Sequence, residues 1–432
     1  MARFAAETPS GASVQRLETL VRTAIFKPAT ALIELLLQEA ADRLDAAYQA
    51  QPGEHRKGRV SLQLQCLFGS FTVERDYYYR PDQKHGHCPA DAALGLEGGY
   101  TPALARLMCL EGADETCFQK AERHLAESGG IHVSARQIQR VVQRVGTCAQ
   151  EWQERPGLAG TTDAPIVYVS ADGTGVPMRK EVLAGRPGKQ PDGSAKTAQA
   201  YLGCVFTQHE CDAKGHPVRD ENSTTYISSF ASITEFGPSL QREAVRRGIE
   251  SAPAVVLLID GAAGLANMGH SHFSDAVQIV DFFHAMEHAG EVLAALIGKE
   301  HREYKKRLGR WAKRLLRNGV KGLIEDARTE ARATPREAAV ESALGYFVKN
   351  VERMQYGTFR KLGYFIGSGV VEAGCKSVIG ARCKQSGMRW SEAGAENILA
   401  FRCIHSSRRI DEFWKYRLNL HVAQNDVLPL AA

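Results

Sequence analysis

The chain has no pair of cysteines at Cys-x-x-Cys spacing, although ten cysteines are scattered over its 432 residues. This pattern is typical of reduced thiols and excludes both an evident disulfide framework and a complete zinc ribbon. Long hydrophobic runs are missing too. The stretch ATALIELLLQEAA (29–41) contains Glu34 and is far shorter than a membrane span. Because MARFAAETPSGASVQ lacks the apolar core of an export signal, we expect a cytoplasmic protein without a membrane partner.

A large net charge is also absent, at only +5, but basic residues occur in blocks. Residues 301–321 (HREYKKRLGRWAKRLLRNGVK) hold nine Lys/Arg against one Glu. Clustered cations gain affinity for nucleic acid by releasing its counterions, whereas the alternative is an ordinary solvated helix face. The sequence predicts DNA contacts from Lys305, Lys306, Arg310, Lys313, Arg314 and Arg317.

The length suits two or three domains. Residues 1–58 form the first segment, in which leucines and alanines at helical spacing predict one long amphipathic helix over 12–49. A β-hairpin around Gly69 and Ser70 is predicted within 59–100. The loop after it offers His85, His87 and Cys88, which is a poor tetrahedral zinc site because no partner pair is present.

Residues 101–150 have the pattern of a helix-turn-helix. One helix is expected to end at Gly129-Gly130, and Ser134 is expected to cap the next. The second helix carries long polar side chains, so the pattern predicts DNA reading, although many helical hairpins look the same. The predicted DNA-contacting residues are Arg136, Gln137, Arg140 and Arg144.

From residue 160 to 284 the sequence predicts a mixed β-sheet with helices on its faces. Three antiparallel-looking strands (166–172, 198–208 and 224–230) precede helix-linked strands that end at Asp260 and Asp281. Residues 285–365 are expected to be almost wholly helical. The sheet pattern then resumes over 366–410, with Glu372 following GSGVV, and 411–432 form a C-terminal tail.

Acids at strand ends are the strongest functional signal. Asp172 and Asp260 each end a strand and precede a glycine turn, at the edge where α/β sheets present their chemistry. Two adjacent carboxylates repel unless a divalent cation lies between them, and Mg²⁺ prefers hard oxygen ligands. With Glu372 they could hold two ions that activate an attacking oxygen and stabilise a leaving one. The alternative is that each acid is only a helix cap or turn former.

Four segments carry a family resemblance: DGTGVPM (172–178), VVLLIDG (255–261), DFFHAMEH (281–288) and 367–402. They resemble the catalytic core of bacterial insertion-sequence transposases of the Kra type, relatives of the Mutator-like superfamily, over about residues 60 to 405. The resemblance implies an RNase H-like fold with an Asp-Asp-Glu triad, interrupted by a helical insertion. The triad falls on Asp172, Asp260 and Glu372. The chain departs from the family where relatives often carry a Cys-x-x-Cys element, because only the zinc-ribbon-like remnant around His85 is left.

The resemblance implies further site residues and partners. Asp281 and His284 match the family's Asp/Cys-x-x-His signature, and Trp390 matches a recurrent tryptophan. We expect a DDE transposase that binds its element's ends, then cuts and joins DNA with two Mg²⁺ ions (or Mn²⁺), acts as a homo-oligomer on DNA, and needs no small-molecule cofactor. Further DNA contacts are expected from Arg179, Lys180, Lys376, Arg382, Lys384, Arg389 and Trp390.

Two other functions stay open at this point. One is a DNA-binding regulator that has kept the fold and lost catalysis. The other is a zinc peptidase, since His284-x-x-Glu287-His288 places two histidines on one helical face with a Glu as base. A phosphatase of the DxDGT kind would need an acid at position 170, which is Ser170 here.

Overall fold

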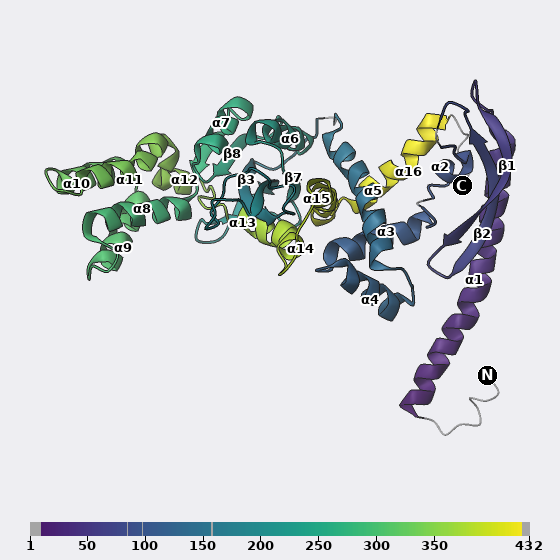
Figure 1. The fold of residues 1–432 in the computed structure, drawn as a ribbon. Helices are drawn as coiled ribbons and strands as arrows, with labels where there is room; N and C mark the ends of the chain where they lie inside the picture. The colour runs from purple at the N-terminus through teal and green to yellow at the C-terminus, as the bar shows by residue number, and fades with distance from the viewer. Residues whose placement is uncertain (1–9, 84, 97, 157–158, 426–432) are drawn as a thin grey trace. The chain divides into compact units, whose positions relative to one another are not determined.

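The structure, a computed structural model, describes residues 10–83, 85–96, 98–156 and 159–425. The chain forms two compact units, residues 1–148 with 410–432 (unit 1) and residues 149–409 (unit 2), shown in Figure 1. The segment expected as a C-terminal tail is helical in α16 (Ile410–Asn425) and groups with unit 1, while 426–432 lie outside the described residues. No helix in the described ranges has the length and apolar character of a membrane span.

Unit 1 begins with a long helix packed on a hairpin. Helix α1 (Gly11–Ala47) packs against the antiparallel pair β1 (His55–Gln65) and β2 (Ser70–Tyr79), as expected around Gly69 and Ser70. One face of α1 packs on Leu64, Phe71 and Val73 of the hairpin. The α1 side chains on this face follow helical spacing and are Ile33, Leu37, Ala41 and Leu44. The amphipathic expectation is wrong in one respect: α1 is also apolar on the opposite, exposed face.

The remaining helices of unit 1 are α2 (Pro89–Ala93), α3 (Pro102–Asp114), α4 (Phe118–Gly129) and α5 (Ala135–Glu154). Helix α4 ends where expected, because Gly130 adopts a left-handed φ of 59° and its N–H bonds to the Ala126 carbonyl. Ser134 precedes α5 and its hydroxyl accepts from the Gln137 N–H at 3.3 Å. The helix, glycine turn and capped helix are therefore all present.

Unit 2 is built on a five-stranded mixed sheet, so the mixed α/β class is confirmed. Its strands are β3 (Ile166–Pro177), β4 (Thr197–Gln208), β7 (Thr225–Ser229), β8 (Ala254–Ile259) and β9 (Val277–Val280), in the order β7-β4-β3-β8-β9. Strand β3 is antiparallel to β4 and parallel to β8, and β9 is parallel to β8. A short hairpin, β5 (Glu210–Cys211) with β6 (Pro217–Val218), follows β4.

Helices cover both faces of this sheet. Alternate residues Val167, Val169 and Ala171 of β3 pack toward α6 (Ile233–Arg246) and α7 (Ala263–His272) in one core. The opposite face meets α13 (Gly369–Gly374), a π-helical turn (Cys375–Gly380) and α15 (Glu392–Ser406), while α14 (Ala381–Cys383) packs on the π-helical turn. Since side chains alternate along a strand, residues 168, 170 and 172 point to this second face.

Between β9 and α13 the chain is helical, as expected. It runs through α8 (Phe282–Ile297), α9 (Tyr304–Leu315), α10 (Val320–Ala331), α11 (Glu337–Asn350), a 3₁₀ turn (Val351–Met354) and α12 (Tyr356–Lys361). In Figure 1 α8 to α12 lie together at one side of the sheet. The excursion leaves the sheet at Asp281 and returns just before Glu372.

Candidate active site

Strand register brings three acids side by side. Parallel pairing joins Ser170 to Leu258 and Ile259 to Val280. Continuing these registers places Asp172 beside Asp260, and Asp260 beside Asp281. Asp260 and Asp281 follow the carboxyl ends of β8 and β9, whereas Asp172 lies within β3, two residues after its pairing with β8 ends at Ser170. The expectation that Asp172 ends its strand before a glycine turn is wrong, because Gly173, Thr174 and Gly175 continue β3 in antiparallel pairing with β4. The three aspartates nevertheless lie side by side where β8 and β9 end, which is the edge where α/β proteins bind ligands.

Asp172 and Asp260 share the sheet face that meets α13, because Leu257 and Ile259 pack in the core on the other side. The carboxylate of Asp172 accepts from the Gly173 N–H at 2.7 Å and from the Cys375 thiol. Burial, with the charge of Asp260, raises the pKa of Asp172 despite these bonds. The pair is thus close enough to repel.

Asp260 is held by two hydrogen bonds, one to its side chain and one to its backbone carbonyl. Its Oδ1 accepts from the Ala262 N–H at 2.8 Å, as in an Asx turn. Its backbone carbonyl accepts from the Tyr346 hydroxyl of α11 at 2.7 Å. The helical excursion therefore holds the end of β8 directly, a contact that the sequence did not indicate.

Asp281 is fully buried and occupied by protein partners. Its Oδ1 caps α8 by accepting the His284 N–H at 2.7 Å, and His284 Nδ1 lies 3.2 Å from the same oxygen. Its Oδ2 accepts from the Ser368 N–H. Asp281 thus links the start of α8 to the loop that precedes Glu372, which is the geometry of a positioning residue.

Glu372 lies in the first turn of α13, where its Oε1 accepts from the Ser368 hydroxyl at 3.0 Å. Three residues later the helix opens into the π-helical turn at Cys375, a rare geometry that occurs often at functional sites. Burial and the neighbouring Asp172 and Glu372 raise the pKa of the Cys375 thiol to about 12. Cys375 was missed from the sequence, although its position one turn after Glu372 could have suggested it.

The potential metal ligands separate into a compact group of three residues and a neighbouring pair of aspartates. Among the described residues, one compact group of ligand atoms within 4.8 Å of one another is Asp281, His284 and Glu372. Asp172 and Asp260 interact electrostatically with each other and with His284, whose pKa is lowered by burial but raised overall by Asp281 and Asp260. The predicted triad of Asp172, Asp260 and Glu372 is not one of the compact ligand groups of the described residues, because Glu372 groups with Asp281 and His284 instead.

A basic hollow lies at the C-terminal end of β3, beyond Asp172. Its volume of about 690 Å³ is within the usual range of ligand pockets, and its cations include Lys180, Lys196, Lys384 and Arg389. Lys384 Nζ donates to the hydroxyl of Thr174, which lies in β3 two residues after Asp172. Arg179 and Lys376 are exposed nearby in the chain, so these cations suit a phosphate backbone.

Two predicted DNA contacts are buried instead. Arg382 is 1% exposed and lies over the Trp390 ring, 5.1 Å from its centroid, and Trp390 itself is 7% exposed. The backbone of Trp390 pairs with β3, accepting from Arg179 N–H at 2.8 Å and donating to the Pro177 carbonyl at 3.1 Å. Direct DNA contact does not fit this burial. The pair fixes the 384–390 segment beside the end of β3.

The basic helix α9 is exposed along most of its length. Lys305, Lys306, Arg310, Lys313 and Arg317 are exposed, as a phosphate-binding face requires. Arg314 differs, because it forms an ion pair with Asp326 of α10. Arg307, which was not predicted, likewise pairs with Glu330.

In unit 1 the exposed cations of α5 line a second hollow. Arg136, Arg140 and Arg144 recur every four residues beside Gly98 and Tyr100. Gln137 has a different role, because its Oε1 accepts from the Ser134 N–H at 2.8 Å and completes a capping box. This role was recoverable from the Ser-x-x-Gln spacing and leaves the arginines as the better DNA contacts.

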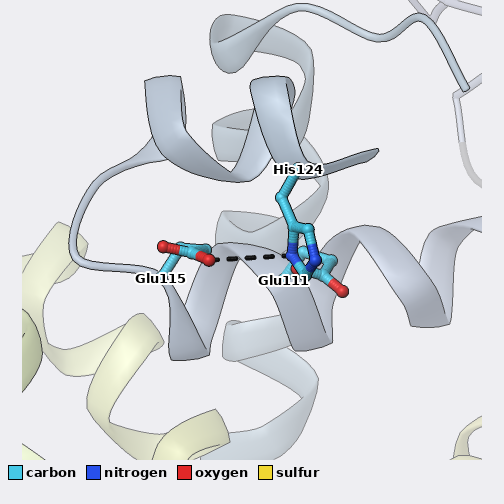
Figure 2. Close-up of side chains that lie close together, drawn as sticks. All are labelled: Glu111, Glu115 and His124. Carbon is cyan, nitrogen blue, oxygen red and sulfur yellow. Dashed lines mark hydrogen bonds and ion pairs between the residues drawn. The ribbon is translucent and has the colours of Figure 1, made fainter. Parts of the chain in front are cut away.

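A second group of three ligand atoms lies in unit 1, far along the chain from the acids of the sheet. Figure 2 shows Glu111 of α3, Glu115 after it and His124 of α4, with His124 Nδ1 2.6 Å from Glu111 and 3.6 Å from Glu115. The hydrogen bond and charge of Glu111 raise the pKa of His124. The cluster joins two exposed helix surfaces as an ion pair.

The residues predicted for the two zinc sites, in the loop around His85 and in the peptidase pattern, lie in different surroundings. His87 pairs through its backbone with Tyr78, and burial raises the pKa of the Cys88 thiol to about 11. Neither they nor His85 belong to a compact ligand group in the described part of the chain. In the peptidase pattern, His284 faces Asp281, whereas His288 lies 2.8 Å from Glu291 and stacks on Tyr346. The two histidines have separate partners.

The chain has little similarity to known proteins. No protein-family model matches it, and no curated protein matches it. Among solved structures, the chain is similar to the Drosophila P element transposase strand transfer complex, with a TM-score of 0.26 and 13% sequence identity. That similarity covers 80% of this chain and 83% of the other.

Proposed function

We propose that the chain is a DDE transposase with an RNase H-like core, which cleaves and joins DNA at the acidic edge of its five-stranded sheet. The observation that carries the proposal is the register of β3, β8 and β9. It aligns Asp172, Asp260 and Asp281 side by side, and Glu372 lies close to Asp281. Isolated turn-forming acids would not be expected to converge from three strands and a helix.

The donor set suits a hard divalent cation. It is dominated by carboxylate oxygens, and the raised pKa of Asp172 reflects burial and an unneutralised neighbour, Asp260. Asp172, Asp260 and Glu372 would hold Mg²⁺, with His284 beside them. When bound, such ions supply the electrostatic activation that phosphodiester chemistry needs.

The protein's own groups then divide the remaining roles. Asp281 and Ser368 hold Glu372 in place, and Tyr346 holds Asp260. Lys180, Lys384 and Arg389 would bind the phosphates flanking the scissile bond. Hydrolysis at an element end breaks the P–O3′ bond and leaves a 3′-hydroxyl. In joining, this hydroxyl attacks a target phosphate and displaces the target's 3′-oxygen.

A nicking assay tests this function. The substrate is a supercoiled plasmid carrying the DNA that flanks the reading frame, incubated with Mg²⁺ or with EDTA. We expect nicking by the wild type, and a reduction of at least about 100-fold in Asp172→Asn, Asp260→Asn and Glu372→Gln. Double variants should be no worse than single ones, because the residues act as a unit.

Asp275→Asn is the matched control, since Asp275 is an exposed acid in a turn before β9. A wild type that binds the flanking DNA but never nicks it would favour the regulator instead. Near wild-type nicking by an acid variant would remove that acid from the site.

A further inference from the structure

Helix α1 exposes an unusual number of large apolar side chains. Val14, Val21, Ile25, Leu32, Leu35 and Leu36 are between 40% and 65% exposed, and Leu20 flanks them. Single exposed apolar residues are normal on a soluble protein, but a contiguous patch of several is not. We call the six side chains the α1 stripe.

The α1 stripe follows the helix axis. Its members are separated by seven, four, seven and then three or four residues, which places them on one side of an α-helix. The opposite side carries Ile33, Leu37, Ala41 and Leu44, which are packed on the β1–β2 hairpin. The stripe therefore takes no part in the core of unit 1 and is apolar for another reason.

We propose that the α1 stripe joins two copies of this chain, helix against helix. The stripe spans residues 14–36, or about 33 Å of helix. Six side chains that each expose about half their surface offer roughly 500 Å² per copy. Two copies would bury about 1,000 Å², near the lower bound of a specific interface.

Charge favours a second copy over other occupants. Helix α1 has four basic residues (Arg16, Arg22, Lys27, Arg43) and five acidic ones (Glu18, Glu34, Glu39, Asp42, Asp45). A surface for anionic lipid or nucleic acid would be predominantly basic. Balanced charges instead allow two identical helices to approach without net repulsion, and the Glu39–Arg43 ion pair closes one end of the stripe.

The proposed dimer is independent of catalysis, so it is tested without DNA or divalent metal. Sedimentation equilibrium of the full chain at about 1–50 μM should show a dimer. Leu32→Glu with Leu35→Glu should give a monomer over the same range. The matched control is Thr19→Glu with Thr23→Glu, which places two charges on the other side of the same helix and should remain dimeric.

Folding is checked by circular dichroism and thermal melting, which should be the same in both double variants because all four positions are exposed. Crosslinking gives a second measurement that keeps the fold intact. Leu32→Cys should be joined to a second copy by a short bis-maleimide, and Thr23→Cys should not exceed the wild-type background. A monomeric wild type, or a dimer that survives Leu32→Glu with Leu35→Glu, would overturn the proposal.

Discussion

At the scale of single residues, the ionised carboxylate of Asp172 lowers the stability of the metal-free fold. Burial and Asp260 raise the pKa of Asp172, so the ionised form is less favourable in the folded chain than in the unfolded one. An acid with a raised folded pKa destabilises the fold at pH values above its unfolded pKa. The penalty is relieved when pH falls and the carboxylate is protonated.

Asp172→Asn should therefore stabilise the metal-free protein. At pH 7 in EDTA we expect the Tm to rise by about 1–3 °C, because the variant removes the charge and keeps the shape. The difference from wild type should shrink as pH falls toward 4. Thermal melting from pH 4 to 8 measures it, with exposed Asp275→Asn as control. A lower Tm for Asp172→Asn at pH 7 would contradict the interpretation.

Replacement of Asp281 should instead destabilise the protein. Asp281→Ala removes the cap of α8 and frees the Ser368 N–H, so unfolding free energy should fall by about 1–2 kcal/mol. Urea denaturation measures the decrease. DNA nicking should fall as well, because Glu372 loses its support. If stability is unchanged, Asp281 does not bind the loop before Glu372.

At the scale of elements, the sequence located the end of β8 but not the end of β3. Asp260 could be placed after β8 because a run of β-formers stops there, whereas β3 continues past Asp172 to Pro177 in pairing with β4. Their alignment depends on inter-strand register, which single-strand patterns do not contain. Burial of Arg382 over Trp390 was equally inaccessible, because the contact depends on how the irregular segment between the two residues folds back. Gln137 was recoverable from capping-box spacing alone.

The α3–α4 pair makes stability in unit 1 depend on pH. Glu111 raises the pKa of His124 above its usual 6.5, so the contribution is full below pH 6.5 and is lost as pH rises through the folded pKa. His124→Gln should therefore destabilise the protein more at pH 5.5 than at pH 9. Chemical denaturation at both pH values checks this, with exposed His132→Gln as control. Equal destabilisation at the two pH values would show that Glu111 holds no charged histidine.

At the scale of the whole molecule, DNA binding should separate into two kinds. Arg136→Ala with Arg140→Ala should cost sequence preference, about 1–3 kcal/mol for each base-edge hydrogen-bonding pair that is removed. Arg310→Ala with Lys313→Ala should instead weaken binding to all DNA and flatten its salt dependence. Titrations of specific and unrelated DNA at several salt concentrations distinguish them.

Arg307→Ala with Arg314→Ala is the control for α9, because both side chains are paired with acids of α10. This double variant should lower DNA affinity less than Arg310→Ala with Lys313→Ala does. If the α5 and α9 variants change sequence preference and salt dependence in the same way, the two surfaces do not have separate roles in DNA binding.

The hydrogen bond between Asp281 and Ser368 joins two points 87 residues apart in the chain. Everything between them leaves and re-enters the sheet at one place, so its length is not fixed by the spacing of the acids. Insertions and deletions in α9 or α10 should accumulate freely during evolution, whereas one added residue in β3 or β8 would turn an aspartate to the wrong face. Chains of very different length could thus share one catalytic centre.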